Sequence, residues 1–389
     1  MMEEIKNNVS KEWKEVKLGE VLKLKNGERP KINDYGIIPV YGANGIMGKT
    51  NDFLIDNDFT IIVGRVGASG EIHLAKGKVW ISDNAIYSQS YKSKKIHLPF
   101  LFYLLTFKNL KQFATKTTHP IITQSFLKNL PILLPPLPEQ QKIAEILSTV
   151  DSAIEKVNQA IEKTQRLKKG LMQELLTKGI GHNEFKDTEI GRIPKEWEVV
   201  RLGEVADLNR GRFAHRPRND PKFYGGKIPF IQTGDINEAN GIIKKYSQTL
   251  NEKGLKISKL FKKGTIVISI AGNIGDVGIL DFDACFPDSI IGINPNDKKV
   301  DRLFLMFLLQ EFKDKLNAIA PRSTQKNINL EILEPLKLPL PPLPEQQKIA
   351  EILSTVDKRL ELLRAKKEKL ERVKKGLMND LLTGKRRVC

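Results

Sequence analysis

Cysteine is almost absent from this sequence of 389 residues, in which only Cys285 and Cys389 occur. Two isolated cysteines exclude a disulfide framework and a thiolate metal site, and they are typical of proteins kept in a reducing compartment. No run reaches the roughly 18 apolar residues that a membrane-spanning helix needs, and the polar N-terminus lacks the apolar core of a secretory signal. We therefore expect a cytoplasmic protein.

Signatures of catalysis are also scarce. The five histidines show no metal-ligand spacing. The stretch GANGIMGKT at residues 42–50 resembles a phosphate-binding loop, but the interval between its glycines is one residue too long and no helix pattern follows it. Asp288, with Asp297 and Lys299 downstream, resembles a nuclease carboxylate set for Mg²⁺, but Asp297 lies in a turn-like segment. Since no glycine-rich methyl-donor loop occurs either, we expect no catalytic residue, metal or cofactor on this chain.

Positive charge is what the sequence has in excess. Lys and Arg number 64 against 46 Asp and Glu, which gives a formal net charge of +18, while 40% of the residues are hydrophobic. A chain of this length and apolar content builds roughly two or three compact domains. The charge predicts a polyanionic partner, and nucleic acid is the polyanion whose binding gains from counterion release. A basic chain that is merely soluble is the alternative, so charge alone does not decide.

A long internal repeat organises the chain. The residues LPPLPEQQKIAEILSTVD occupy 134–151 and recur unchanged at 340–357. A weaker pair, WKEVKLGEV at 13–21 and WEVVRLGEV at 197–205, precedes the two copies. Self-similarity over this distance indicates a duplicated module rather than a solenoid. The predicted order is globular domain, helix, globular domain, helix.

Each copy of the repeat reads as the start of a long helix. Pro138 and Pro344 suit the first helical position, and Gly179 and Gly384 suit the helix ends. About 40 residues, or about 60 Å of helix, lie between them. If the apolar stripes pair, the helices are antiparallel and an approximate two-fold axis relates the globular domains. The predicted helix-pairing residues are Ile143, Leu147, Val150 and Ile154 in the first helix and Ile349, Leu353, Val356 and Leu360 in the second.

The residues around each helix start have separate expected roles. Pro135, Pro136 and Pro138 favour an extended polyproline conformation, which makes the run a stiff spacer. A ligand for an aromatic groove of a partner is the competing interpretation, and it is disfavoured because the run leads directly into a helix. Glu139 and Glu345 lie in the first turn, where a carboxylate favours the positive end of the helix dipole.

The two globular parts share one pattern. Residues 12–129 and 196–334 contain short alternating strands interrupted by glycines, followed by amphipathic helices at 99–114 and 303–318. The predicted fold class is therefore α+β, with two α/β domains joined by two long antiparallel helices that resemble a coiled coil. The internal duplication gives this architecture pseudo-two-fold symmetry.

Basic and polar loops in both domains are the candidate contacts to nucleic acid. Arg side chains bind phosphate or guanine bidentately, and Asn and Gln pair with adenine edges. Any single residue of this kind is more often a solvated surface residue, so the prediction concerns the clusters. In the first domain the candidates are Arg29, Lys31, Lys116, Thr117 and His119. In the second domain they are Arg210, Arg212, Arg216, Arg218, Arg322, Thr324, Gln325 and Lys326.

The chain resembles the specificity subunits of type I restriction–modification systems over nearly its whole length. The resemblance lies in the paired LPPLPEQQKIAEIL helix starts, LeuThrLysGly at Leu176, LeuThrGly at Leu382, IPKEWEVVRLGEV at Ile193 and GGKIPFIQTGDI at Gly225. It implies a non-catalytic subunit of a restriction endonuclease and adenine-DNA methyltransferase complex. The implied parts are target-recognition domains at 1–134 and 181–340, a central helical region at 135–180 and a C-terminal helical region at 341–389.

The same resemblance implies partners and a mode of action. Each recognition domain would read one half of a bipartite, asymmetric target in double-stranded DNA, and the helices would set the spacer between the halves. The helices would also dock two methyltransferase (modification) subunits, which use S-adenosylmethionine. Motor (restriction) subunits that use ATP and Mg²⁺ would join them, and no membrane would take part.

Two other classes of protein fit parts of the sequence. A free-standing DNA-binding regulator fits the charge and the symmetry but gives the helix surfaces no role. An interaction scaffold made of the helices and proline runs needs no DNA. Duplex binding that weakens steeply with salt would separate the scaffold from the other two classes. Neighbouring genes for a methyltransferase and a motor protein would favour the specificity subunit over the regulator.

Overall fold

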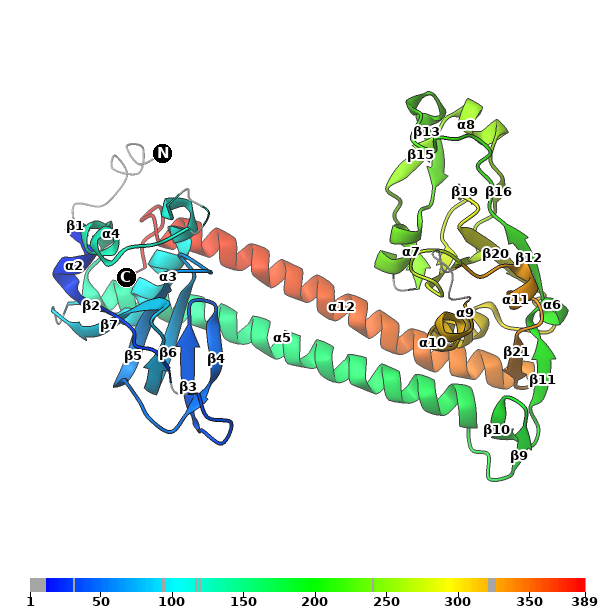
Figure 1. Cartoon of the computed structure of the whole chain (residues 1–389), viewed down its shortest axis with the longest axis horizontal. Coiled ribbons are helices and arrows are strands. Elements are labelled where there is room, and N and C mark those ends of the chain that lie inside the picture. Colours follow the sequence, from blue (N-terminus) through cyan, green and yellow to red (C-terminus); the bar gives the residue numbers. More distant parts are fainter. Residues whose placement is uncertain are drawn as a thin grey trace. The chain divides into compact units, whose positions relative to one another are not determined.

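Two compact units make up the chain, and each contains parts of both long helices. The computed structural model describes residues 12–30, 32–92, 95–115, 118, 120–239, 241–320 and 327–388. Unit 1 contains Met1–Gln159 and Arg364–Cys389, and unit 2 contains Ala160–Leu363. The division falls inside α5 (Leu137–Lys178) and α12 (Leu343–Leu381), the long helices drawn in green and in orange to red in Figure 1.

Unit 1 is built around one mixed sheet. Its six strands follow the order β2-β7-β5-β6-β3-β4, and all neighbours are antiparallel except β3 and β6. Because successive side chains of a strand point to opposite faces, Ile61 and Val63 enter one hydrophobic cluster and Ile62 enters another. Besides α5, the elements are β1 (Lys14–Lys17), α2 (Leu18–Val21), β2 (Leu22–Asn26), β3 (Ile38–Gly42), β4 (Gly45–Thr50), β5 (Ile55–Gly64), β6 (Ile72–Ile81), β7 (Ala85–Tyr91), α3 (Leu98–Phe107), the 3₁₀ turn η1 (Leu110–Phe113), α4 (Gln124–Asn129) and β8 (Pro131–Leu134).

Unit 2 holds two larger sheets. One has five strands in the order β12-β20-β17-β18-β14, and the other has four in the order β15-β13-β19-β16. The first part of unit 2 contains β9 (Phe185–Thr188), β10 (Gly191–Pro194), β11 (Glu198–Arg201), α6 (Leu202–Val205), β12 (Ala206–Arg210), η2 (Pro221–Phe223), β13 (Tyr224–Phe230), α7 (Thr233–Ala239), β14 (Ile242–Ile243), β15 (Gln248–Leu250) and α8 (Glu252–Lys256). The rest, besides α12, contains β16 (Leu260–Phe261), β17 (Ile266–Ser269), β18 (Val277–Leu280), β19 (Ala284–Cys285), β20 (Ile290–Pro295), α9 (Arg302–Glu311), α10 (Lys313–Ile319), α11 (Leu330–Leu333) and β21 (Lys337–Leu340).

In each globular part, a strand near its beginning pairs with its last strand. In unit 1, β1 is antiparallel to β8 with Lys14 opposite Leu134. In unit 2, β11 is antiparallel to β21 with Glu198 opposite Leu340. Each proline run begins directly after the second strand of its pair, β8 or β21. Both long helices are therefore connected to their globular parts in the same way.

The long helices agree with the sequence pattern. α5 has 42 residues and α12 has 39. Gly179 follows the last residue of α5 with a φ of 68°, a conformation that glycine adopts without strain. A Cβ atom on Gly170 or Gly376 would meet nothing within 4 Å, which excludes close helix contact as the reason for either glycine. Among the described residues, no helix is both long and apolar enough to cross a bilayer.

Two local predictions have different outcomes. The stretch at 42–50 forms the turn of the β3–β4 hairpin and strand β4, so no helix follows its glycines. The predicted helix at 99–114 is wrong in length, because α3 ends at Phe107. Asn109 adopts a left-handed φ of 48° there and starts a separate 3₁₀ turn. The second amphipathic helix is likewise divided, into α9 and α10.

Candidate nucleic-acid interface

The arginine-rich loop of unit 2, residues 211–220, follows β12, and hydrogen bonds of its backbone hold it in place. The Gly211 amide donates to Ile290 O at 2.8 Å, and the Arg212 amide donates to Phe286 O at 3.0 Å. A Cβ atom at position 211 would collide with the carbonyl oxygen of Pro287, so only glycine permits this approach. Phe213 anchors the loop and is 2% exposed. The loop is therefore preorganised rather than loosely attached.

Three of the four predicted arginines, Arg210 at the end of β12 and Arg216 and Arg218 in the loop, converge on Asp288. Arg210 Nε donates to the Asp288 backbone oxygen at 2.7 Å. One guanidinium nitrogen of Arg216 lies 3.0 Å from one oxygen of the Asp288 carboxylate, and Arg218 contacts the other oxygen. Arg212 is exposed, and no partner of its side chain occurs among the residues that the structure describes. Sequence reasoning missed this role of Asp288, which lies 70 residues or more from its partners.

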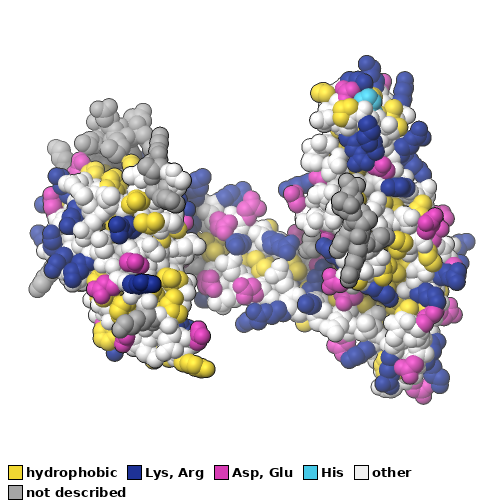
Figure 2. Space-filling view, in the orientation of Figure 1, with side chains coloured by type: hydrophobic (Ala, Val, Ile, Leu, Met, Phe, Trp, Pro, Cys, Tyr) yellow, Lys and Arg dark blue, Asp and Glu magenta, His cyan; other side chains and the backbone are white. Residues whose placement is uncertain are grey.

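More ionic side chains lie close to this loop. Asp220 pairs with Lys222 at 2.8 Å and with His215 at 3.2 Å. The hydrogen bond from the Lys222 side chain is the main cause that lowers the pKa of Asp220. Figure 2 shows Lys and Arg side chains gathered over the end of unit 2 that carries β13, β15 and α8. This end of the domain can therefore attract a polyanion.

Unit 1 has a corresponding turn with different side chains. A Cβ atom on Gly27 would collide with the Ser82 carbonyl oxygen, as one on Gly211 would with that of Pro287. Arg65 donates to the backbone oxygen of Asp83 at 3.5 Å, as Arg210 does to that of Asp288. The predicted contact Arg29 is exposed two residues after Gly27.

The two acidic residues that resemble a nuclease carboxylate set both contact arginine. Arg302 lies 3.1 Å from Asp297, and Arg216 lies 3.0 Å from Asp288. No group of three or more His, Cys, Asp or Glu side chains that could hold a metal ion occurs in the described ranges.

The remaining predicted contacts to nucleic acid lie outside the described residues and stay predictions. They are Lys31, Lys116, Thr117, His119, Arg322, Thr324, Gln325 and Lys326.

The repeated glutamates anchor the helix starts. Glu139 is 5% exposed and accepts hydrogen bonds from Trp13 Nε1 at 3.2 Å and Arg387 Nε at 2.6 Å. In unit 2, Glu345 accepts from Trp197 Nε1 at 3.0 Å and lies 2.9 Å from His182 Nε2. The expectation of a simple helix-dipole role was therefore incomplete, because each carboxylate is also a tertiary hydrogen-bond acceptor.

The glutamines that follow complete each anchor. Gln140 accepts from the His97 amide at 2.9 Å and donates to Pro135 O at 2.8 Å. Gln346 accepts from the Asp301 amide at 2.8 Å and donates to Pro341 O at 2.8 Å. These matching bonds tie the proline run, the helix and the globular core together in the same way at both helix starts.

The predicted helix-pairing residues divide into two groups. Ile143 and Leu147 share a core cluster with Leu381 and Leu382, and Ile349 and Leu353 share one with Leu175 and Leu176. Each helix start therefore packs against both its own domain and the end of the other helix. Leu360 is also buried, whereas Val150, Ile154 and Val356 are half-buried, so pairing through these three stays a prediction.

One ion pair occurs twice in the helices. In unit 1, Lys374 Nζ lies 2.6 Å from Asp151 and above the ring of Tyr103. In unit 2, Lys168 Nζ lies 2.6 Å from Asp357 and above the ring of Phe307. Burial and the hydrogen bond to Asp151 raise the pKa of Tyr103. Within each unit the contacts run from the first half of one helix to the second half of the other, which makes the helices antiparallel.

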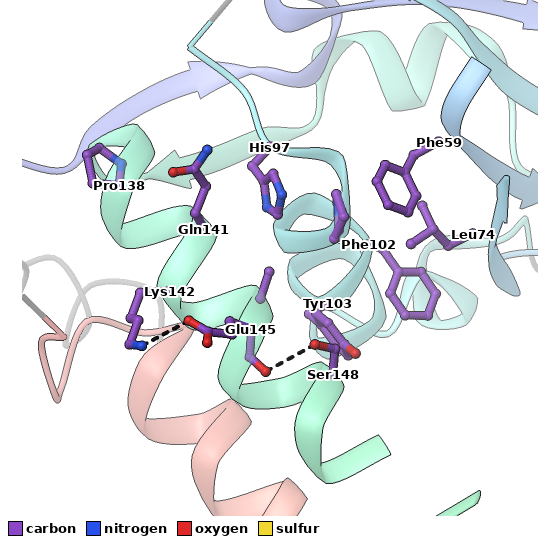
Figure 3. Close-up of a pocket in the computed structure, with 12 residues that line it drawn as sticks. Phe59, Leu74, His97, Phe102, Tyr103, Pro138, Gln141, Lys142, Glu145 and Ser148 are labelled. Atoms are coloured by element: carbon purple, nitrogen blue, oxygen red, sulfur yellow. Dashed lines mark hydrogen bonds and ion pairs between the residues drawn. The ribbon is translucent and has the colours of Figure 1, made fainter. Parts of the chain in front are cut away.

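A pocket of about 650 Å³ lies in unit 1 where α3 meets the start of α5 (Figure 3). Lys142 and Glu145 form an ion pair of 2.9 Å at its wall, and the Ser148 hydroxyl donates to the Glu145 backbone oxygen at 3.0 Å. Burial lowers the pKa of His97, whose Nδ1 atom is buried without a hydrogen-bond partner among the described residues.

The duplicated order of globular part and long helix is matched by a known protein family. The family model for the type I restriction modification DNA specificity domain matches residues 10–164 and 194–372. The chain therefore belongs to this family, that of the specificity subunits of type I restriction–modification systems.

Relatives and solved structures agree with this membership. The chain is 33% identical to the type I restriction enzyme MjaVIII specificity subunit of Methanocaldococcus jannaschii, over 98% of this chain and 94% of the relative. It is 38% identical to the putative MjaX specificity subunit of the same organism, over 76% of this chain and 69% of that one. The crystal structure of a type I S subunit from M. genitalium has the same fold, with a TM-score of 0.68, 19% identity and 96% of each chain covered. A structure from a type I system has a TM-score of 0.54 and 19% identity, over 96% of this chain and 98% of that one.

Proposed function

We propose that the chain reads a bipartite, asymmetric DNA target, with one half contacted by each recognition domain. The carrying observation is that the same turn, at Asp83 and at Asp288, supports an arginine-bearing loop in both domains while the loop side chains differ. The same frame with different contacts supports two different half-sites. The proposed recognition domains are 1–134 and 181–340, and the helical regions at 135–180 and 341–389 set the spacer.

The alternatives fit fewer features. A scaffold without DNA leaves the net charge of +18 and the preorganised arginine loop without a role. A free-standing regulator uses both features but gives no role to the exposed apolar residues of the helices. The proposal includes a cytoplasmic location for the protein, which is compatible with a DNA target.

Arg212→Ala should weaken reading of one half-site only. The side chain is exposed on a fixed loop, and loss of one such contact costs about 1–3 kcal/mol of binding free energy. The complex of this chain with its modification subunits would be titrated with duplexes scrambled in one half at a time, after the target has been mapped by sequencing adenine methylation. We expect the preference for the intact second half to fall while that for the first half persists.

The exposed Arg359→Ala in α12 provides the matched control, since it removes the same charge from unit 2 away from the loop. Equal losses at both half-sites would contradict modular reading. Unchanged preference at both would remove the loop from the interface.

Partner docking is the second part of the proposal. The solved structure with a TM-score of 0.54 comes from work on complex assembly of a type I system. In this chain, Leu167 and Val373 are apolar helix residues that are 53% and 44% exposed. They occupy equivalent places in the repeat, each directly before the buried or half-buried lysine of the repeated ion pair. Two exposed apolar sites, one at Leu167 and one at Val373, suit two copies of one partner, the modification subunit. S-adenosylmethionine, ATP and Mg²⁺ would be bound by partners and not by this chain.

Replacing Leu167 and Val373 together by Glu should abolish capture of modification subunits. Burying a carboxylate in an apolar contact would weaken each site at least about tenfold, which corresponds to about 1.4 kcal/mol. Each single variant should retain one of the two subunits, as measured by native mass spectrometry of the co-expressed complex. Lys169→Glu with Lys375→Glu is the control, because these exposed residues occupy equivalent positions of the repeat. Retention of two subunits by the double variant would show that Leu167 and Val373 are not docking sites.

A further inference from the structure

The Asp288 carboxylate lies between two guanidinium groups in the loop that the proposed function assigns to DNA. Arg216 contacts one carboxylate oxygen at 3.0 Å, and Arg218 contacts the other. We propose that Asp288 is a positioning residue, which holds Arg216 and Arg218 in the orientation in which they read the second half-site. The inference rests on the proposed function, and it assigns the carboxylate a part in base specificity.

The carboxylate is itself mounted on a rigid support. The Ile290 amide closes the turn by donating to Pro287 O at 3.1 Å, and Arg210 Nε holds the Asp288 backbone oxygen at 2.7 Å. Phe286, directly before the turn, is fully buried and stacks on Phe261 at a centroid distance of 4.0 Å. A carboxylate on such a turn can fix the direction of a long, flexible side chain.

Arg216 is restrained at both ends of its guanidinium group. One terminal nitrogen donates to Phe213 O at 2.6 Å and to His215 O at 3.0 Å, while the other contacts Asp288. Of the five N–H donors of arginine, the Nε hydrogen and one terminal hydrogen are left for another acceptor. Restrained donors with free hydrogens are what bidentate reading of a base requires.

Stability alone does not account for this arrangement. The Asp288 side chain is 35% exposed, and those of Arg216 and Arg218 are 53% and 42% exposed. Ion pairs this open to solvent contribute little to folding. Two cations around one anion also leave the group positively charged, so it still attracts DNA while each arginine keeps one orientation.

Asp288→Asn separates positioning from simple charge repulsion. If Asp288 only repelled DNA, its neutralisation would strengthen binding to every duplex equally. If it positions the arginines, the freed guanidinium groups would bind any nearby phosphate, so non-specific binding would rise while discrimination falls. Each additional phosphate contact would steepen the slope of log affinity against log salt by about 0.9.

The experiment uses the chain assembled with its modification subunits and two duplexes, the mapped target and one with the second half scrambled. We expect Asp288→Asn to lower the affinity ratio between them about tenfold, to leave binding to the scrambled duplex equal or tighter, and to steepen its salt dependence. Asp288→Glu, which keeps the charge on a longer side chain, should fall between wild type and Asp288→Asn. Thermal unfolding of each variant would verify that unit 2 remains folded.

Two controls make the same charge change elsewhere. Asp297→Asn frees Arg302 in the same unit, and Asp83→Asn alters the corresponding turn of unit 1, and both should keep the ratio at the second half-site. A ratio within twofold of wild type in Asp288→Asn would overturn the inference, as would an equal gain on both duplexes. If replacing Arg212, Arg216 and Arg218 by Ala also left the ratio unchanged, the proposed role of the loop would fail instead.

Discussion

Leu353→Ala should lower the free energy of unfolding of unit 2 by about 2–5 kcal/mol, the usual range for a fully buried leucine. Leu353 is 0% exposed and lies in the core that joins the start of α12 to the recognition domain. Its equivalent in the repeat, Leu147, is also 0% exposed and occupies the corresponding core of unit 1. Hydrogen exchange followed by mass spectrometry would report the two units separately.

The repeat supplies the control for this prediction. Leu147→Ala should lower protection in unit 1, whereas Leu353→Ala should lower it in unit 2. The exposed Lys358→Ala in α12 should change stability by no more than about 0.5 kcal/mol. Equal loss of protection in both units from either leucine variant would show that the two cores unfold as one.

Lys168→Asp should destabilise unit 2 by about 3 kcal/mol, because it removes a buried cation and leaves two carboxylates facing each other. The Lys168 and Asp357 side chains are only 11% and 27% exposed, and their 2.6 Å contact joins α5 to α12. Urea unfolding of the full chain would measure the loss. Adding Asp357→Lys restores opposite charges and should recover at least half of it.

Lys169→Asp makes the same charge change at the next, exposed position of α5, and it should have little effect. If the exchanged pair recovered nothing, the contribution of Lys168 would come from the contact of its ammonium group with the Phe307 ring rather than from the ion pair with Asp357.

The sequence was most informative about features that repeat with a regular period. The apolar stripe and the terminal glycines predicted α5 and α12 because helical periodicity over about 40 residues has few other solutions. The copied helix start predicted the duplication, and the direction of the helices followed from the order of the domains. By contrast, the helix predicted at 99–114 ended early because a left-handed Asn109 carries no periodic signal.

Tertiary partners were beyond the reach of the sequence pattern. The sequence indicates only a helix-dipole role for Glu139. Its hydrogen-bond partner Trp13 lies 126 residues away along the chain, beyond any local pattern. The paired tryptophans before the paired glutamates were the signal that could have joined them. Arg216 and Arg218 were identified as cations, but only the fold brings Asp288 between them.

The closing strand pairs have a consequence for how one globular part could be exchanged for another. The β1–β8 pair and the β11–β21 pair each lie directly before a copy of the same eighteen-residue segment, so both globular parts are joined to their helices in the same way. A crossover inside that segment would exchange one globular part and leave the strand pair, the tryptophan–glutamate hydrogen bond and the start of the helix intact. Because both segments have the same sequence and the same strand pair before them, the helix start would be unaltered by such an exchange.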